Sequence, residues 1–231
     1  IVLDNSSLSF GAVVNGSQFV KRVVMTNRGD IGAKFRWDTA AFAPDFAISP
    51  ATGYISPGMD LTFEVTFKPN VTCSDLRYDG LKCHLEGWKP ICLTLTGMCI
   101  APTPVKETQN FAAYVRQKDT KSLQIVNRTN AQWILKPKIE GEHWSGPESL
   151  IVEPQSTKGY ELTYRPLTMN QDGKKHVGSV FFALPDGTGL LYSVTGTAEP
   201  PRPVAKVSRD IPCKTSYTEV LSVPNWLPTP Q

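Results

Sequence analysis

The sequence predicts an all-β chain with two tandem immunoglobulin-like β-sandwiches, each of about seven strands. Three observations predict this fold. Apolar and polar residues alternate with a period of two in many short runs, and the same runs return after about 100 residues. The 19 prolines and the charged share of only 19% disfavour a long helix or a coiled coil. The aromatic share of 10% disfavours a disordered chain.

The repeat rests on three anchors that occur in the same order in both halves. Residues 23–28 (VVMTNR) return as residues 123–128 (LQIVNR), offset by 100. Residues 65–69 (VTFKP) return as 162–166 (LTYRP), and residues 93–97 (LTLTG) return as 192–196 (YSVTG). A third copy begins at residues 220–225 (VLSVPN). We therefore predict units at residues 1–101 and 102–200, followed at 201–231 by a linker and the opening strand of a third, truncated unit.

Within each unit, the strands follow from alternation and the turns from Gly, Pro, Asn and Asp. Strands with one buried face are expected at residues 34–38, 61–68, 91–96 and 160–165. Turns are expected at residues 15–16, 28–30, 56–58, 171–173 and 185–187. Trp37 and Trp133 occupy equivalent positions after the Asn-Arg element, so we assign both to the sandwich cores rather than to ligand stacking. Pro-rich residues 101–104 (APTP) and 199–203 (EPPRP) are expected to be stiff, extended joints.

The five cysteines are expected to be free thiols in a reducing compartment, because they show no regular disulfide spacing. Cys83 is expected to be buried and Cys92 to face the other side of its strand. A disulfide between Cys73 and Cys83 is one alternative. Zinc held by Cys83, His84, Cys92 and Cys99 is another, although structural zinc sites usually use closely spaced pairs.

No catalytic, cofactor-binding or metal-binding residues are predicted, so we expect a protein without enzymatic activity. His84, His143 and His176 are far apart in sequence, and no serine has a nucleophile motif around it. The densest basic cluster, residues 174–176, is expected to be a solvated turn rather than a nucleic-acid site. No run of 18 apolar residues predicts a membrane helix, so neither nucleic acid nor a membrane is an expected partner.

Several segments resemble the ASH domain, a module of centrosomal and ciliary proteins including Hydin that is related to major sperm protein and PapD-type chaperone domains. They are residues 8–11 (LSFG), 23–29, 46–50 (FAISP), 53–58, 65–69 and 95–97. The second unit resembles this family more weakly, because it offers residues 156–159 (STKG) where the first unit has Pro57 and Gly58. Tandem arrays of ASH units are similar to those of Hydin and of large cilia- and flagella-associated proteins, above all one with a calponin-homology domain.

The resemblance implies a structural segment of a ciliary or flagellar axoneme, often in its central apparatus. The implied partners are other axonemal and cytoskeletal proteins, including microtubule-associated ones, and neighbouring immunoglobulin-like units of the same chain. The alternative is a secreted or cell-surface immunoglobulin-like adhesion module, for which the Asn-X-Ser/Thr triplets at Asn5, Asn15, Asn70 and Asn127 would be glycosylation sites.

Residues 205–231 have two interpretations. They contain Tyr217, Val220, Leu221, Val223 and Trp226, and could pack as a donated strand on the second unit or on a neighbouring molecule. They could equally form a flexible tail.

Overall fold

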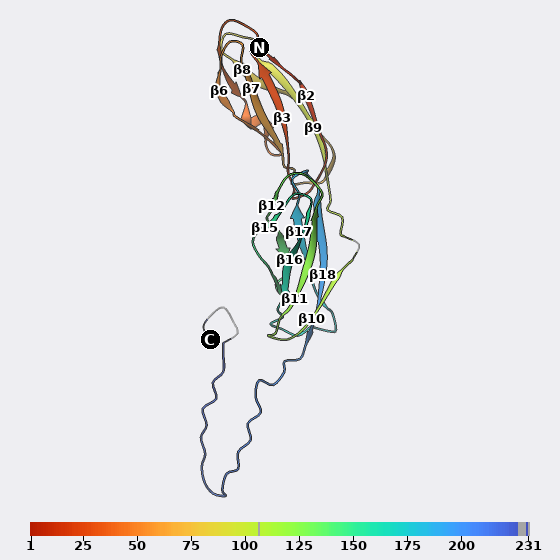
Figure 1. The fold of residues 1–231 in the computed structure, drawn as a ribbon, viewed down its shortest axis with the longest axis vertical. Coiled ribbons are helices and arrows are strands. Elements are labelled where there is room, and N and C mark those ends of the chain that lie inside the picture. Colours follow the sequence, from red (N-terminus) through yellow and green to blue (C-terminus); the bar gives the residue numbers. More distant parts are fainter. Residues whose placement is uncertain (106, 226–229, 231) are drawn as a thin grey trace.

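The computed structural model describes residues 1–105, 107–225 and 230. These residues form 18 strands and one short 3-10 helix, arranged as two sandwiches that are stacked end to end (Figure 1). Strands β1 to β9 form the N-terminal sandwich, and β10 to β18 form the C-terminal sandwich. The prediction of an all-β, immunoglobulin-like chain is confirmed.

The N-terminal sandwich has a sheet in the order β1-β3-β7-β5 and a second sheet in the order β2-β9-β8-β4-β6. Its first long strand, β2, pairs in parallel with its last, β9, and the other pairs are antiparallel. The elements are β1 (Val2–Leu3), β2 (Ser7–Val14), β3 (Phe19–Thr26), β4 (Ala33–Trp37), η1 (Thr39–Phe42), β5 (Phe46–Ser49), β6 (Thr52–Ile55), β7 (Asp60–Phe67), β8 (Cys73–Leu85) and β9 (Ile91–Ile100).

The C-terminal sandwich repeats this plan in sheets β10-β18-β17-β13, β11-β16-β14 and β12-β15. Its first strand again pairs in parallel with its last. The elements are β10 (Gln109–Tyr114), β11 (Asp119–Asn127), β12 (Trp133–Leu135), β13 (Lys138–Glu140), β14 (Trp144–Ser145), β15 (Leu150–Val152), β16 (Ser156–Tyr164), β17 (His176–Ala183) and β18 (Gly189–Glu199).

In the described residues, each sandwich therefore has nine strands, where the sequence predicts about seven. The additional elements are short, and one arises at Pro137. In the N-terminal sandwich, β4 pairs with both β6 and β8. In the C-terminal sandwich, the equivalent segment is divided into β12, which pairs with β15, and β13, which pairs with β17. Pro137 lies between them and lacks the N–H that a continuous ladder would need.

The three anchors of the repeat lie on equivalent strands. The first falls on β3 and β11, the second on β7 and β16, and the third on β9 and β18. These strands hold the centre of each sandwich, where two separate hydrophobic clusters form. Trp37 is 2% exposed and Trp133 is 7% exposed, so their assignment to the two cores is confirmed. Burying one such side chain contributes about 1.5 to 3 kcal/mol.

The repeated asparagine is buried in both sandwiches and hydrogen-bonds to nearby backbone groups, a role that the sequence pattern does not reveal. The Asn27 side-chain amide donates to the carbonyl of Ile31 at 2.9 Å, and its oxygen accepts the Gly29 N–H at 3.1 Å. The Asn127 amide donates to the carbonyls of Ala131, Val152 and Glu153. Residues 31, 131 and 153 lie outside strands and Val152 ends β15. The asparagine side chain therefore donates to backbone carbonyls at places where the ladders end.

The turn before β16 corrects one sequence interpretation. Pro57 and Gly58 correspond to Pro154 and Gln155, not to residues 156–159, which lie inside β16. Gln155 has φ of 52° and Gly58 has φ of 67°, so both turns use a left-handed residue after proline. The Gln155 side chain compensates by donating to the Arg128 carbonyl at 2.8 Å.

Residues 201–225 extend away from the C-terminal sandwich and contain no strand (Figure 1). Residues 205–225 are exposed throughout, with Val220 at 92%, so the suggested packing of this part on the second unit is wrong. A strand that lacks the rest of its own sheet has no ladder partner. Trp226, which the same suggestion used, lies outside the described residues. The linker itself is anchored, because the Arg202 guanidinium lies 3.8 Å from the Tyr114 ring centroid.

Candidate docking surfaces

The residues weighed as zinc ligands are not brought together. Neighbouring residues of a strand point to opposite faces, so Cys83 faces the core at 0% exposure while His84 is exposed. Cys92 is exposed, and Cys99 is buried near the other end of β9. Among the described residues, no three His, Cys, Asp or Glu side chains are grouped so that they could hold a metal ion.

The alternative Cys73–Cys83 disulfide is also wrong. Both cysteines belong to β8, ten residues apart in one extended strand. At about 3.3 Å per residue they lie roughly 33 Å apart, far beyond the reach of a disulfide. Cys83 is buried as predicted, and burial raises the pKa of its thiol to about 11.

Two histidines that sequence spacing keeps apart do meet in the structure. The rings of His143 and His176 are 3.9 Å apart between centroids, and His176 Nδ1 lies 2.7 Å from the Tyr164 hydroxyl. Burial and, second, the neighbouring His143 lower the pKa of His176, while burial raises the pKa of Tyr164 to about 12. The protonated phenol can therefore donate to a neutral imidazole, which satisfies a hydroxyl that is otherwise surrounded by the core.

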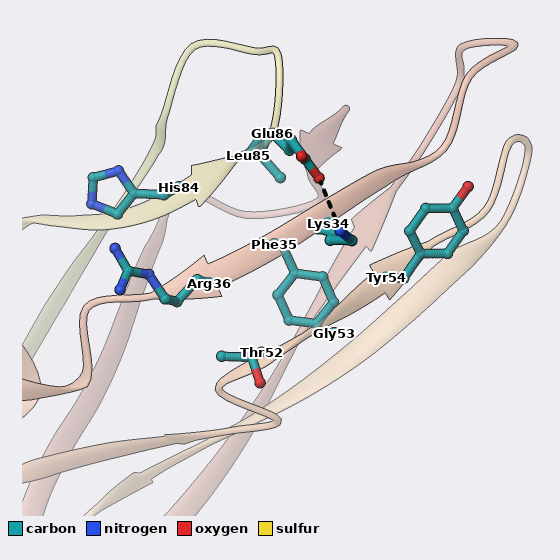
Figure 2. Close-up of a pocket in the computed structure, with 9 residues that line it drawn as sticks. All are labelled: Lys34, Phe35, Arg36, Thr52, Gly53, Tyr54, His84, Leu85 and Glu86. Atoms are coloured by element: carbon teal, nitrogen blue, oxygen red, sulfur yellow. Dashed lines mark ion pairs between the residues drawn. The ribbon is translucent and has the colours of Figure 1, made fainter.

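The first candidate surface is an open hollow of about 660 Å³ on the outer face of β4, β6 and β8 (Figure 2). Cross-strand register places Arg36 opposite both Thr52 and His84, and Lys34 opposite Tyr54. Figure 2 shows Arg36 and His84 together at one end and Tyr54 at the other. Tyr54 is 58% exposed. The surface therefore combines apolar and cationic groups, as protein-binding patches often do.

The floor of the hollow depends on a close approach of two strands. The Phe35 ring is 3% exposed, and a Cβ on Gly53 would lie 2.7 Å from its Cζ atom. Glycine is therefore required at residue 53 by space rather than by backbone angle. Lys34 and Glu86 form an ion pair of 3.6 Å across the rim. Both side chains are well exposed, so this pair contributes little stability and is free to rearrange around a ligand.

The hollow borders a free sheet edge. Strand β6 is the last strand of its sheet, so one side of its backbone has no ladder partner. Such an edge can accept an added strand from another protein, with backbone hydrogen bonds giving affinity and side-chain pockets giving selectivity. The edge is only four residues long, which limits non-specific pairing.

The second surface is already occupied, because it joins the two sandwiches. The turn between β2 and β3 lies against the turn between β17 and β18. The Val14 N–H donates to the Gly187 carbonyl at 2.8 Å, and the Ser17 hydroxyl donates to the Thr188 carbonyl at 2.7 Å. Ser17 is only 1% exposed. We call this contact the turn–turn joint; it links residues more than 170 positions apart.

Close packing supports the hydrogen bonds of the joint. Gly187 has φ of +84°, and a Cβ there would lie 3.0 Å from Phe19 Cβ and 3.1 Å from Val13 Cγ2. Gly16, with φ of +88°, would bring a Cβ within 3.2 Å of Phe181 Cε1. The Pro-rich linker adds one backbone bond, from the Val105 N–H to the Leu191 carbonyl at 2.7 Å. The sequence located this linker but not the contact between the turns.

None of the described helices has the length and apolar character that crossing a membrane requires. The only helical element among these residues is the four-residue η1.

Comparison with known proteins identifies similar chains for both sandwiches. Residues 1–98 match the family described as HYDIN/CFA65/VesB-like, Ig-like domain. The chain is 48% identical over 232 aligned positions to the "Hydrocephalus-inducing protein homolog" of Homo sapiens, and 47% identical over 232 to the "Hydrocephalus-inducing protein" of Mus musculus. Each alignment covers 100% of this chain and 4% of the relative, so the chain spans a small part of these relatives.

Among solved structures, the ASH/PapD-like domain 7 of human CEP192 is similar with a TM-score of 0.39 and 17% identity. That match covers 44% of this chain and 86% of the other. Both relatives are hydrocephalus-inducing proteins. They correspond to Hydin, one of the proteins whose tandem arrays the sequence resembles, and not to the one with a calponin-homology domain.

Proposed function

We propose that this chain, whose residues 1–98 match the HYDIN/CFA65/VesB-like family of immunoglobulin-like domains, is a structural segment of a ciliary or flagellar protein. The segment acts as a scaffold without catalysis, in the axoneme and specifically in its central apparatus. The observation that carries this proposal is the 48% identity to a hydrocephalus-inducing protein along the entire chain. The identity extends over both sandwiches and so supports a shared role for the pair.

The proposed mechanism is docking through shape and edges. The hollow around Arg36 and Tyr54 and the free edge of β6 offer one site for axonemal or cytoskeletal partners, including microtubule-associated ones. The joint offers a rigid spacing between this site and the next unit. In this proposal the units are residues 1–101 and 102–200, and residues 201–231 lead into a third unit whose opening strand pairs only when the rest of that unit is present.

Neighbouring immunoglobulin-like units are further proposed partners, and the turn–turn joint supports this. The turn between β8 and β9 is the N-terminal counterpart of the turn between β17 and β18, which the joint covers. Here the counterpart is uncovered, with Trp88 at 49% exposure. It borders a hollow of about 910 Å³ lined by Ile1, Leu85 and Pro90 among others. An exposed tryptophan beside an apolar hollow is typical of an interface anchor.

We propose that a preceding unit rests on this turn as Val14 and Ser17 rest on the turn at Gly187. Oxidative footprinting of Trp88 tests this in the 231-residue chain and in a natural chain that extends before Ile1. Protection of Trp88 in the longer chain is expected. Tyr54 is a matched control because it lies on the face of the sheet and should react equally in both. Equal oxidation of Trp88 in the two chains would exclude the contact.

One of the four glycosylation triplets, at Asn127, gives no support to the secreted alternative. The Asn127 side chain is 1% exposed, and its amide nitrogen donates to three backbone carbonyls. A glycan on that nitrogen would expose the core and break these bonds. The folded chain therefore offers no acceptor at this asparagine.

Localisation of the tagged full-length protein in a ciliated cell tests the main proposal. Signal along the axoneme is expected, and signal confined to the secretory pathway would refute the proposal. Arg36→Glu, which reverses a charge in the hollow, should reduce incorporation into the axoneme. Lys158→Glu reverses an exposed charge on β16, outside the hollow, and should not. If both variants incorporate like the unaltered protein, the hollow is not the docking site.

A further inference from the structure

Two of the five cysteines lie directly opposite each other on neighbouring strands. Cys73 begins β8, and the register of the antiparallel β8–β9 pair places it against Cys99. Directly opposed residues of an antiparallel pair have Cα atoms about 4.5 to 5.5 Å apart. A disulfide requires Cα atoms about 4.4 to 6.8 Å apart. The backbone therefore already holds these two residues at the separation that a disulfide needs.

The remaining cysteines do not have such a partner. Cys83 lies opposite Ile91, and Cys92 lies opposite Lys82. Cys213 is exposed in the extended segment after the C-terminal sandwich. All five cysteines belong to the described residues, so Cys73 and Cys99 are the one pair that strand register brings together.

The two thiols differ in access to solvent. Cys73 is partly exposed, and its S–H donates to the Asp75 carbonyl at 3.5 Å. Cys99 is 3% exposed. Burial, then Asp45, then the Cys73 thiol itself raise the pKa of Cys99. An oxidant from solvent therefore reaches Cys73 first, and Cys99 is placed to react with whatever forms there.

The local backbone also allows the small adjustment that bond formation requires. The ladder is irregular between Cys73 and Leu76, and residues 68–72 before Cys73 belong to no strand. Cys99 is followed by Ile100, whose carbonyl accepts the Asn15 N–H beside the turn–turn joint. A bond between the two sulfurs would thus attach the start of β8, which follows a loop, to the strand that leads into the joint.

We propose that Cys73 and Cys99 form a redox-active dithiol that oxidises reversibly to an intramolecular disulfide. With hydrogen peroxide as oxidant, the Cys73 thiolate attacks one peroxide oxygen, the O–O bond breaks, and a sulfenic acid and one water form. The Cys99 sulfur then attacks the Cys73 sulfur, the S–O bond breaks, and the second water leaves. Two thiols lose two electrons and two protons, and one peroxide becomes two waters. Dithiothreitol or glutathione returns both thiols by exchange.

Peptide mapping of the full chain tests the pair. The native protein is treated with hydrogen peroxide, its remaining thiols are alkylated, and it is digested without reductant and analysed by mass spectrometry. A linked peptide pair containing Cys73 and Cys99 is expected, and it should disappear after dithiothreitol. Cys73→Ser should abolish the link, whereas Cys92→Ser, on the same strand pair, should leave it unchanged. Peroxide treatment that leaves both thiols alkylatable, or that links Cys92 to Cys213 instead, would overturn the proposal.

A probe that needs no oxidation provides an independent test. Phenylarsine oxide bonds to two neighbouring thiols at once and releases one water. The reduced native chain should take up one phenylarsenic group and lose alkylation at Cys73 and Cys99 together. Uptake that persists in Cys73→Ser, or no uptake by the folded chain, would show that the thiols are not within reach of each other.

Discussion

The turn–turn joint makes a specific prediction about Gly187→Val. Residue 187 has φ of +84°, and its missing Cβ leaves just enough room for Val13 and Phe19 of the N-terminal sandwich. A valine would place its Cβ 3.0 to 3.1 Å from these side chains and its two methyl groups closer still. The turn would have to move away, so the bonds from Val14 and Ser17 would lengthen or break.

The magnitude follows from the contacts that the joint would lose. Each hydrogen bond contributes about 0.5 to 1.5 kcal/mol, and the joint contains two between the turns. The valine should therefore weaken the joint by about 2 kcal/mol, which is roughly a thirtyfold shift toward separated sandwiches. The left-handed angle adds about 1 to 2 kcal/mol of strain within the hairpin. Gly187 belongs to neither hydrophobic cluster, but Val13 belongs to the N-terminal cluster and Phe19 packs against it. Thermal unfolding of the variant therefore checks that both sandwiches stay folded.

Amide relaxation by NMR distinguishes one rigid body from two. In the unaltered chain, β1–β9 and β10–β18 should report one common rotational diffusion tensor, as expected for an elongated body. In Gly187→Val, each sandwich should tumble faster and with its own tensor. Small-angle scattering should show a broader distribution of overall dimensions.

Gly173→Val provides the matched control. Gly173 has φ of +71°, but a Cβ there meets nothing within 4 Å. The substitution therefore introduces similar backbone strain without a clash at the joint. Common tumbling should persist in this variant. Common tumbling in folded Gly187→Val, or separate tumbling in the unaltered chain, would refute the reasoning.

Three further predictions concern buried or partly buried polar groups. Asn127→Ala removes two N–H donors that lie within hydrogen-bond distance of three carbonyls and an oxygen that accepts the Thr129 N–H. It should lower the free energy of unfolding by about 3 kcal/mol in urea titrations. The pKa of His176 is lowered from 6.5, so the unfolded chain binds more protons between the folded-state pKa and 6.5. Stability should therefore fall as pH drops below 6.5, and His176→Phe should remove this dependence in the same titrations. Because Cys83 is buried and Cys92 is exposed, and because burial raises the pKa of the Cys83 thiol to about 11, the folded chain should alkylate Cys92 much faster than Cys83 by mass spectrometry.

Controls separate these effects from general destabilisation. Asn130 is exposed and accepts one bond from Gln155, so Asn130→Ala should change stability by less than about 0.5 kcal/mol. An Asn127→Ala variant as stable as Asn130→Ala would contradict the claim that the buried Asn127 hydrogen bonds stabilise the sandwich. A pH profile that His176→Phe leaves unaltered would place the titrating group elsewhere. Equal alkylation rates of Cys83 and Cys92 in native buffer would show that the core of the N-terminal sandwich, which contains Cys83, readily admits the reagent.

Local patterns of sequence determined the fold class and the order of the main strands. Alternation in β7, β9 and β16 follows from having one face in the core and one in water, and that requirement is visible in any short window. The repeat was visible because the same buried positions recur, including Trp37 with Trp133 and Asn27 with Asn127. The division of one strand at Pro137 changed the strand count but not the architecture.

The functional geometry was decided by tertiary structure, because it depends on residues that are distant in sequence. The joint brings Ser17 to Thr188, and no pattern near either residue indicates the other. The hollow beside Tyr54 requires β4, β6 and β8 to lie side by side, and the meeting of His143 with His176 requires the starts of β14 and β17 to lie together. Spacing alone suggested Cys83 as a partner for Cys73, whereas strand register selects Cys99. Sequence periodicity reports which face of a strand is buried; register and packing decide which residue lies opposite.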